Sequence, residues 1–312
     1  MPEQKIKLPQ DEESHETPIK KKARTGSPSG TQTSALKRKR VAPEEWEEDW
    51  DIIRELRRVK DAPVDTVGCD KLADSDAPID VYRFHVLIAA MLSSQTKDAK
   101  TAEAMTKLKA MPGGLTAESV LTQSDASLAE LIKSACFHNT KAKNIRKTAS
   151  ILQAKHASLV PSVLSDLLAL PGVGPKMATL VLGCAFGNVS EGICVDTHVH
   201  RICSLLGWGC LACESCQQPE HTRQALESWL PVELWGELTL CLVGLGQQTQ
   251  TDRLKLFDRA MGSSMPRKTA RFLYKIGYKP PAGKFELWKD ALWYGEDGLV
   301  LTDAIKEFLE ED

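Results

Sequence analysis

Apolar side chains recur at helical spacing along most of the chain beyond residue 43. In residues 44–59 they fall three or four positions apart, the period of one apolar helix face, at Trp46, Trp50, Ile53 and Leu56. The same pattern predicts helices in residues 81–110 with a polar break at 93–98, and in 124–135, 139–157 and 162–172. Between residues 80 and 250 no sustained alternation of apolar and polar residues predicts a strand, so the expected fold class is all-α.

One segment interrupts this helical pattern abruptly. The stretch ALPGVGPKMA, residues 169–178, places a turn between a helix that ends at Leu170 and a helix that begins at Pro175. Proline suits the first turn of a helix because its missing amide hydrogen would be unpaired there, and glycine permits a tight turn. The pattern predicts a helix-hairpin-helix over about residues 165–187, although an ordinary helical hairpin is the alternative. Its open backbone amides would bind a DNA phosphate, at Gly172, Val173 and Gly174.

A carboxylate follows the hairpin in the segment ICVDTHVHR, residues 193–201. Asp196 precedes a helical run, so its simplest role is an N-cap that accepts a hydrogen bond from a free amide, worth about 1 kcal/mol. After one helix and one loop the chain would also return toward the hairpin, where Asp196 would face Lys176. The two residues are therefore candidates for one site.

Three further segments accompany these two in a fixed order along the chain. They are MLSSQTKDA at 91–99, IKSACFHNTKAKNI at 132–145 and ALESWLPVELWGELTLCLVGLGQQT at 225–249. Together with LPGVGPKMA and VDTHVHR they resemble the endonuclease III family of DNA glycosylases, in particular its eukaryotic nuclear branch, over roughly residues 44–249. Five ordered motifs are far more specific than a single hairpin, which many DNA-binding proteins share.

The resemblance implies a bifunctional enzyme of base excision repair, a DNA N-glycosylase and abasic-site lyase that removes oxidised pyrimidines. Lys176 would attack C1′ of the sugar and form a Schiff base, and β-elimination would then cleave the strand 3′ of the abasic site. Asp196 would stabilise the positive charge on the sugar and assist proton transfer. The alternatives are a monofunctional glycosylase of the same superfamily and a catalytically silent DNA-binding protein. The sequence leaves the preferred lesion open.

The resemblance also implies which residues touch DNA. Excision requires the nucleotide to leave the duplex, because C1′ lies inside the stack. Gln95 and Phe137 occupy the positions that insert into the space left behind, where an apolar wedge replaces lost stacking. A core aromatic is the alternative for Phe137. His198 and Arg201 are expected near the phosphates.

The expected architecture is two helical lobes with a DNA-binding cleft between them. Residues 81–190 form the lobe that carries the hairpin and Lys176. Residues 42–80 with 191–249 form the second lobe, which carries Asp196. Residues 250–312 are a divergent C-terminal segment that receives no functional interpretation.

The nine cysteines indicate free thiols or a metal cluster rather than disulfides. The family commonly carries four cysteines after GQQT that bind a [4Fe-4S] cluster. Here no cysteine follows Cys241, so these ligands are missing and no cofactor is expected. A weaker candidate set lies earlier in the chain, with surface thiols as its alternative, at Cys203, Cys210, Cys213 and Cys216.

Residues 1–41 lack apolar periodicity and are expected to form a disordered tail. KKKAR at 20–24 and KRKR at 37–40 resemble a bipartite nuclear import signal, which implies an import receptor as partner and a nuclear location. A basic arm that touches DNA is the alternative. Acidic residues in the tail count against a mitochondrial presequence, and a mitochondrial location is left open.

Charge and hydropathy narrow the class of partner. The 40 basic and 42 acidic residues give a formal net charge of −2, so affinity for DNA must come from a local basic surface. No apolar run is long enough to span a membrane, and no membrane partner is expected. The expected ligand is double-stranded DNA that contains oxidised pyrimidines or abasic sites, bound by a monomer.

Overall fold

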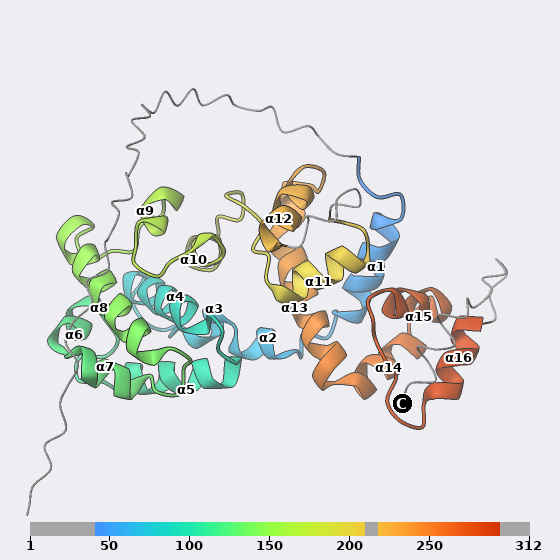
Figure 1. Cartoon of the computed structure of the whole chain (residues 1–312), viewed down its shortest axis with the longest axis horizontal. Helices are drawn as coiled ribbons and strands as arrows, with labels where there is room; N and C mark the ends of the chain where they lie inside the picture. Colours follow the sequence, from blue (N-terminus) through green and yellow to red (C-terminus); the bar gives the residue numbers. More distant parts are fainter. Residues whose placement is uncertain (1–40, 210–217, 294–312) are drawn as a thin grey trace, which may run out of the picture. The chain divides into compact units, whose positions relative to one another are not determined.

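The computed structural model describes residues 41–209 and 218–293, and all regular structure in these ranges is helical, as the all-α expectation required. The tail to residue 40 lies outside these residues, as do Cys210, Cys213 and Cys216. The helices in Figure 1 are α1 Trp46–Leu56, α2 Pro63–Val67, α3 Cys69–Leu72, α4 Ile79–Ser93, α5 Asp98–Lys109, α6 Ala117–Thr122, α7 Asp125–Leu131, α8 His138–Lys155, α9 Leu164–Leu168, α10 Pro175–Phe186, α11 Thr197–Leu205, α12 Pro219–Glu227, the 3₁₀ helix η1 Val232–Leu234, α13 Trp235–Thr251, α14 Arg253–Met261, α15 Pro266–Lys275 and α16 Phe285–Trp293. Across the described ranges, none of these helices is long and apolar enough to cross a membrane.

A first hydrophobic core forms around α4. Residues 84–92 of this helix are all buried, because the segment FHVLIAAML is apolar on nearly every side. α10 packs against α4, and α8 packs against α4, α6 and α7 (Figure 1). The buried apolar members of this core run from Leu72 to Ala185, so the core holds the hairpin helices α9 and α10 in place.

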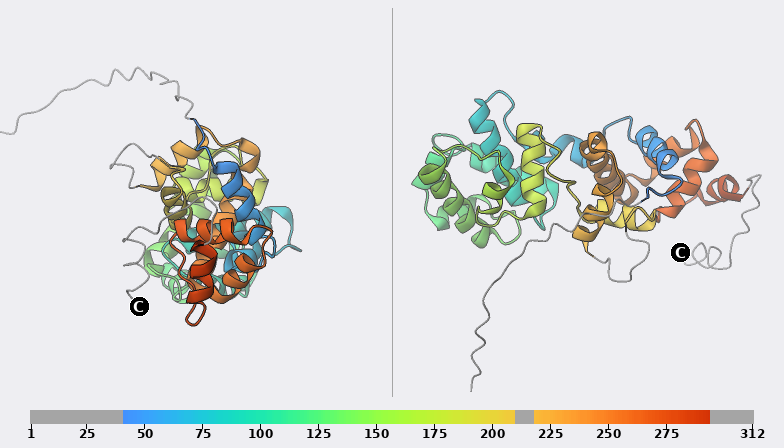
Figure 2. Two further views of the ribbon diagram at one scale, coloured as in Figure 1. Left: turned by 90° about the vertical axis from the view of Figure 1, so that its right-hand side faces the viewer. Right: turned by 90° about the horizontal axis from the view of Figure 1, so that it is seen from above.

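A second hydrophobic core joins α1 to the helices that follow residue 192. The C-terminal segment supplies a large share of it through Phe257, Phe272, Tyr278 and Trp288, all at most 3% exposed. The Trp288 ring lies 5.1 Å from the Tyr278 ring and 5.9 Å from the Phe257 ring, between centroids. Both views in Figure 2 show α14, α15 and α16 packed together. Helices α14 to α16 are therefore part of the folded core.

The predicted lobe boundary at residue 81 is wrong for α3 and the loop after it. Leu72 and Ala73 join the first core, because α3 packs against α4. The Asp74 amide also donates to His85 Nδ1 over 3.2 Å, and the other nitrogen of this buried ring lies 3.1 Å from the Leu115 carbonyl oxygen. This polar link fastens the loop to α4, so the first core begins near residue 69.

Candidate active site and DNA-contacting loops

The predicted helix-hairpin-helix consists of α9, α10 and the turn between them. Gly172 has a φ of 79°, and a Cβ placed there would lie 2.6 Å from Asn144 Nδ2 on α8, so glycine is required. Gly174 is the N-cap of α10, and no side chain caps the first amides of this helix. Val173 departs from the expectation. Its side chain is buried and its amide donates to the Leu170 carbonyl over 3.1 Å, so this amide is already bonded within the turn.

Lys176 is the second residue of α10 and is exposed. The Cys194 thiol donates to the Lys176 carbonyl oxygen over 3.7 Å, which brings the segment 193–196 against the start of α10. Burial raises the pKa of the Cys194 thiol to about 11, and the charge of Lys176 opposes that rise. The charge of Lys176 also acts on Cys69, in α3, whose pKa burial raises to about 12.

Asp196 is the N-cap of α11, and its carboxylate accepts a hydrogen bond from the Val199 amide over 2.8 Å. The N-cap role predicted from sequence is therefore confirmed. The charge of Asp196 raises the pKa of Cys194 and Asp98, the same two groups on which Lys176 acts in the opposite sense. The fold thus brings the predicted lysine and aspartate to one site.

A second carboxyl, Asp98, belongs to this site and was not singled out from the sequence. It is half-buried at the start of α5, and its Oδ2 accepts a hydrogen bond from Gln247 Nε2 over 2.9 Å. Burial raises the pKa of Asp98, against the hydrogen bond from Gln247 and the charges of His198 and Lys176. Gln247 also accepts from the Val64 amide over 2.9 Å, so both ends of its amide are fixed.

His198 and Arg201 have different surroundings. His198 packs on α13, because a Cβ at Gly246 would lie 2.6 Å from His198 Nδ1, and its charge acts on Asp98. Arg201 is half-buried. It donates to the Ile276 carbonyl over 2.8 Å and to Thr249 Oγ1 over 3.3 Å. Its guanidinium thereby ties α11 to α13 and to the end of α15, and its place near the phosphates stays a prediction.

Gln95 and Phe137 are both exposed, and both have left-handed backbone conformations. Their φ angles are 51° and 57°, a region that residues other than glycine seldom adopt. The Phe137 side chain is 65% exposed, so the core-aromatic alternative is wrong. The Cys136 amide donates to Thr96 Oγ1 over 3.2 Å, which links the two loops directly beside these residues.

Comparisons with known proteins identify the family of the chain. Residues 88–232 match the HhH-GPD superfamily of base excision DNA repair proteins. The chain is 48% identical to Endonuclease III-like protein 1 of Gallus gallus over 207 residues, which cover 66% of this chain and 72% of that protein. It is 42% identical to the endonuclease III homolog of Schizosaccharomyces pombe over 236 residues, 75% of this chain and 64% of the homolog. The chain belongs to the endonuclease III family.

Solved structures of this endonuclease III family support the assignment. A trapped endonuclease III–DNA covalent intermediate matches with a TM-score of 0.52 and 26% identity, over 63% of this chain and 84% of that one. A non-covalent endonuclease III–DNA complex matches with a TM-score of 0.51 and 26% identity, over 64% and 85%. This chain is accordingly a DNA-binding glycosylase of base excision repair.

The chain lacks the cysteines after GQQT that the family resemblance would require for a [4Fe-4S] cluster. The chain has no cysteine after Cys241, and only three residues separate the GQQT motif from α14. Cys203, the first member of the weaker set, is fully buried in the second core, and burial raises the pKa of its thiol. A ligand thiol must lose its proton, which this environment disfavours. Over residues 41–209 and 218–293, no three Cys, His, Asp or Glu side chains are placed to hold a metal ion.

Proposed function

We propose that this glycosylase is bifunctional and acts on oxidised pyrimidines in duplex DNA, with Lys176 as the nucleophile. The observation that carries the proposal is the contact of segment 193–196 with the start of α10, through the Cys194 thiol and the Lys176 carbonyl. The charges of Lys176 and Asp196 also act on the same carboxyl, Asp98, which indicates that all three side chains share one site. A covalent step is consistent with the similar protein solved as a trapped endonuclease III–DNA intermediate.

The proposed excision and strand cleavage use the amine of Lys176 and the carboxylate of Asp196. The neutral amine of Lys176 attacks C1′, the bond between C1′ and the base breaks, and the base leaves with a proton. The bond between C1′ and O4′ then breaks as the remaining amine proton passes to O4′, which opens the sugar ring and leaves an imine between Lys176 and C1′. Removal of a C2′ proton then expels the 3′ phosphate by β-elimination. Asp196 stabilises the positive charge on the sugar during attack and accepts a proton afterwards.

Asp98 would act as the second carboxyl of the site. Its half-buried position favours the protonated form, while the hydrogen bond from Gln247 fixes the orientation of the carboxyl group. Two carboxyls with different surroundings can divide acid and base roles between them. We assign proton donation to Asp98 and charge stabilisation to Asp196, whose carboxylate is held by the Val199 amide.

The DNA contacts would come from three loops on the first core. The free amides at the start of α10, beside Gly172 and Gly174, bind a phosphate, favoured by the positive end of the helix. Gln95 and Phe137 enter the duplex and fill the space of the extruded nucleotide. His198 stays a predicted neighbour of the phosphates, and the cleft between the lobes stays the predicted place of the DNA.

The enzyme would work without a [4Fe-4S] cluster, since helices α14 to α16 build the second core from aromatic side chains instead. Iron and sulfide analysis of freshly purified active protein tests this statement. We expect less than stoichiometric iron and no visible absorbance band, whereas one cluster for each chain would contradict it.

We also propose a nuclear location through an import receptor that binds the basic segments 20–24 and 37–40, and a monomeric enzyme. Alanine substitution of both basic segments in a fluorescent full-length fusion should abolish nuclear accumulation. Retained nuclear accumulation would contradict the import proposal. Co-localisation of the fusion with a mitochondrial marker tests for a mitochondrial location. The molar mass of the purified chain by light scattering tests whether it is a monomer.

Borohydride trapping on duplex DNA tests the reaction class. We expect a covalent adduct with a duplex that carries thymine glycol and with one that carries an abasic site, because reduction captures the imine. Excision without an adduct would support the monofunctional alternative. Binding without excision would support the silent alternative. A panel of lesions in the same duplex then ranks the substrates.

A further inference from the structure

A buried lysine fixes the turn that carries Gln95. Lys141 lies on α8, and only 7% of it is exposed. Its ammonium donates to the carbonyl oxygens of Leu92 and Ser94 over 2.6 and 2.7 Å, and to Thr96 Oγ1 over 3.0 Å. All three acceptors belong to the end of α4 or to the turn after it, so one side chain of α8 holds this turn from behind.

The environment of Lys141 is unusual for a charged group. Its three hydrogen bonds go to neutral oxygens, and burial lowers the pKa of Lys141. The last carbonyls of a helix lack internal partners and carry partial negative charge, which offsets part of the unfavourable burial. In some proteins a buried charge of this kind specifies one geometry at the expense of stability.

The same turn is bonded to the loop before α8. Thr96 Oγ1 donates to the Ser94 carbonyl over 3.1 Å and accepts the Cys136 amide over 3.2 Å. Cys136 directly precedes Phe137, the N-cap of α8. The hydrogen bonds therefore close a ring from Lys141 through Thr96 to Cys136 and back into α8.

The two exposed residues on this ring have backbone conformations that need such support. Gln95 and Phe137 are two of the four non-glycine residues with positive φ among those that the structure describes. Left-handed backbone in such residues persists only where the surrounding contacts hold it. The ring of hydrogen bonds supplies those contacts for both loops at once.

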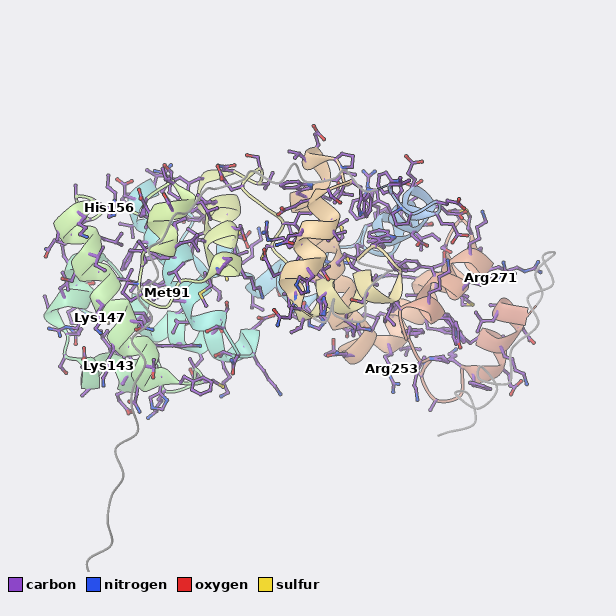
Figure 3. The ribbon with its side chains drawn as sticks, turned by 45° about the horizontal axis from the view of Figure 1, so that its top comes forward. Met91, Lys143, Lys147, His156, Arg253 and Arg271 are labelled. Atoms are coloured by element: carbon purple, nitrogen blue, oxygen red, sulfur yellow. The ribbon has the colours of Figure 1, made fainter. Side chains whose placement is uncertain are left out.

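We propose that Lys141 is a positioning residue, which through Thr96 fixes the Gln95 turn and the Phe137 loop relative to each other so that they enter the duplex together. The inference rests on the proposed insertion of these two residues. Lys143 and Lys147, which Figure 3 shows along the same helix, are exposed and lack this role. The position of the charge, and not the basic character of α8, matters for opening the duplex.

The experiment compares duplex opening with chemistry that needs no opening. A duplex with 2-aminopurine opposite the lesion reports strand opening by fluorescence. A single-stranded oligonucleotide with an abasic site reports imine formation by trapping, without an opposing stack. The variants are Lys141→Met, Thr96→Val and its conservative partner Thr96→Ser, which keeps the hydroxyl. Lys155→Met, an exposed lysine at the far end of α8, is the matched control.

We expect Lys141→Met and Thr96→Val to slow opening of the duplex by about tenfold or more, the loss that one to two hydrogen bonds represent. Thr96→Ser and Lys155→Met should open the duplex at the parent rate. The trapped yield on the single strand should stay within about twofold of the parent for all folded variants. If Lys141→Met does not fold, the Thr96 pair carries the test.

Two outcomes overturn the inference: equal losses on the duplex and the single strand, or equal opening by Thr96→Val and Thr96→Ser. Phe137→Ala separates this failure from failure of the proposed function. Slow opening by Phe137→Ala with parent-like opening by the Lys141 and Thr96 variants refutes only the positioning role. Parent-like opening by Phe137→Ala refutes the insertion role itself.

Discussion

Replacing Asp196 by asparagine separates the two roles that the structure gives this residue. Asparagine caps a helix about as well as aspartate, so Asp196→Asn keeps the hydrogen bond from Val199 and loses about 0.3–1 kcal/mol of charge–dipole energy. Asp196→Ala loses the cap as well, a further cost of about 1 kcal/mol. Both variants remove the carboxylate from the site. We therefore expect excision to slow by about 10²–10⁴-fold in each, roughly 3–5 kcal/mol of transition-state stabilisation.

Urea unfolding measures the loss of folding stability, and single-turnover excision of thymine glycol with enzyme in excess measures the loss of rate. Asp125→Asn is the matched control, because it removes a first-turn carboxylate from α7. We expect a similar small loss of stability from this control and an unchanged excision rate. If Asp196→Asn excises at the parent rate, Asp196 is an N-cap alone and has no part in the chemistry.

Three further predictions concern stability. Burial raises the pKa of Asp49 from 3.8 to about 6, so the contribution of Asp49 to the free energy of unfolding is fully present below about pH 4 and is lost as pH rises through 6. Urea unfolding across that pH range should therefore show a smaller fall in stability for Asp49→Asn than for the parent. Trp288→Ala, at a fully buried side chain, should cost about 3–5 kcal/mol, measured the same way, and an unchanged value would contradict the role of α16 in the second core. Gly172→Ala should cost about 1 kcal/mol or more, because it meets Asn144 at positive φ, and should weaken binding of abasic duplex in a fluorescence anisotropy titration.

The features that local pattern dictates were predictable from the sequence. The Pro and Gly residues of ALPGVGPKMA predict the turn between α9 and α10, and the position of Asp196 before a helical run predicts its cap. The family motifs added two predictions of role, Lys176 as the nucleophile and Phe137 as an exposed wedge, and these roles stay predictions. The exposed Phe137 side chain agrees with that interpretation.

The features that depend on packing between distant segments were not predictable in this way. Lys141, Lys143 and Lys147 look alike in NTKAKNIRKTAS, and only the approach of α4 buries the first of them. Asp98 follows a lysine in a polar stretch, and the hydrogen bond that fixes its carboxyl group comes from Gln247, 149 residues further along. The hydrogen bond of Arg201 to the Ile276 carbonyl, 75 residues further along, was likewise not predictable from the local sequence.

Peptide mapping of the trapped adduct tests directly whether Lys176 forms the covalent bond to DNA. The borohydride-reduced complex with a thymine glycol duplex is digested with nuclease and protease, and the modified peptide is located by mass spectrometry. We expect the sugar remnant on the Lys176 side chain, and no adduct from Lys176→Gln, which should still bind abasic duplex. A remnant on another lysine, or a normal yield of adduct from Lys176→Gln, would contradict this role of Lys176.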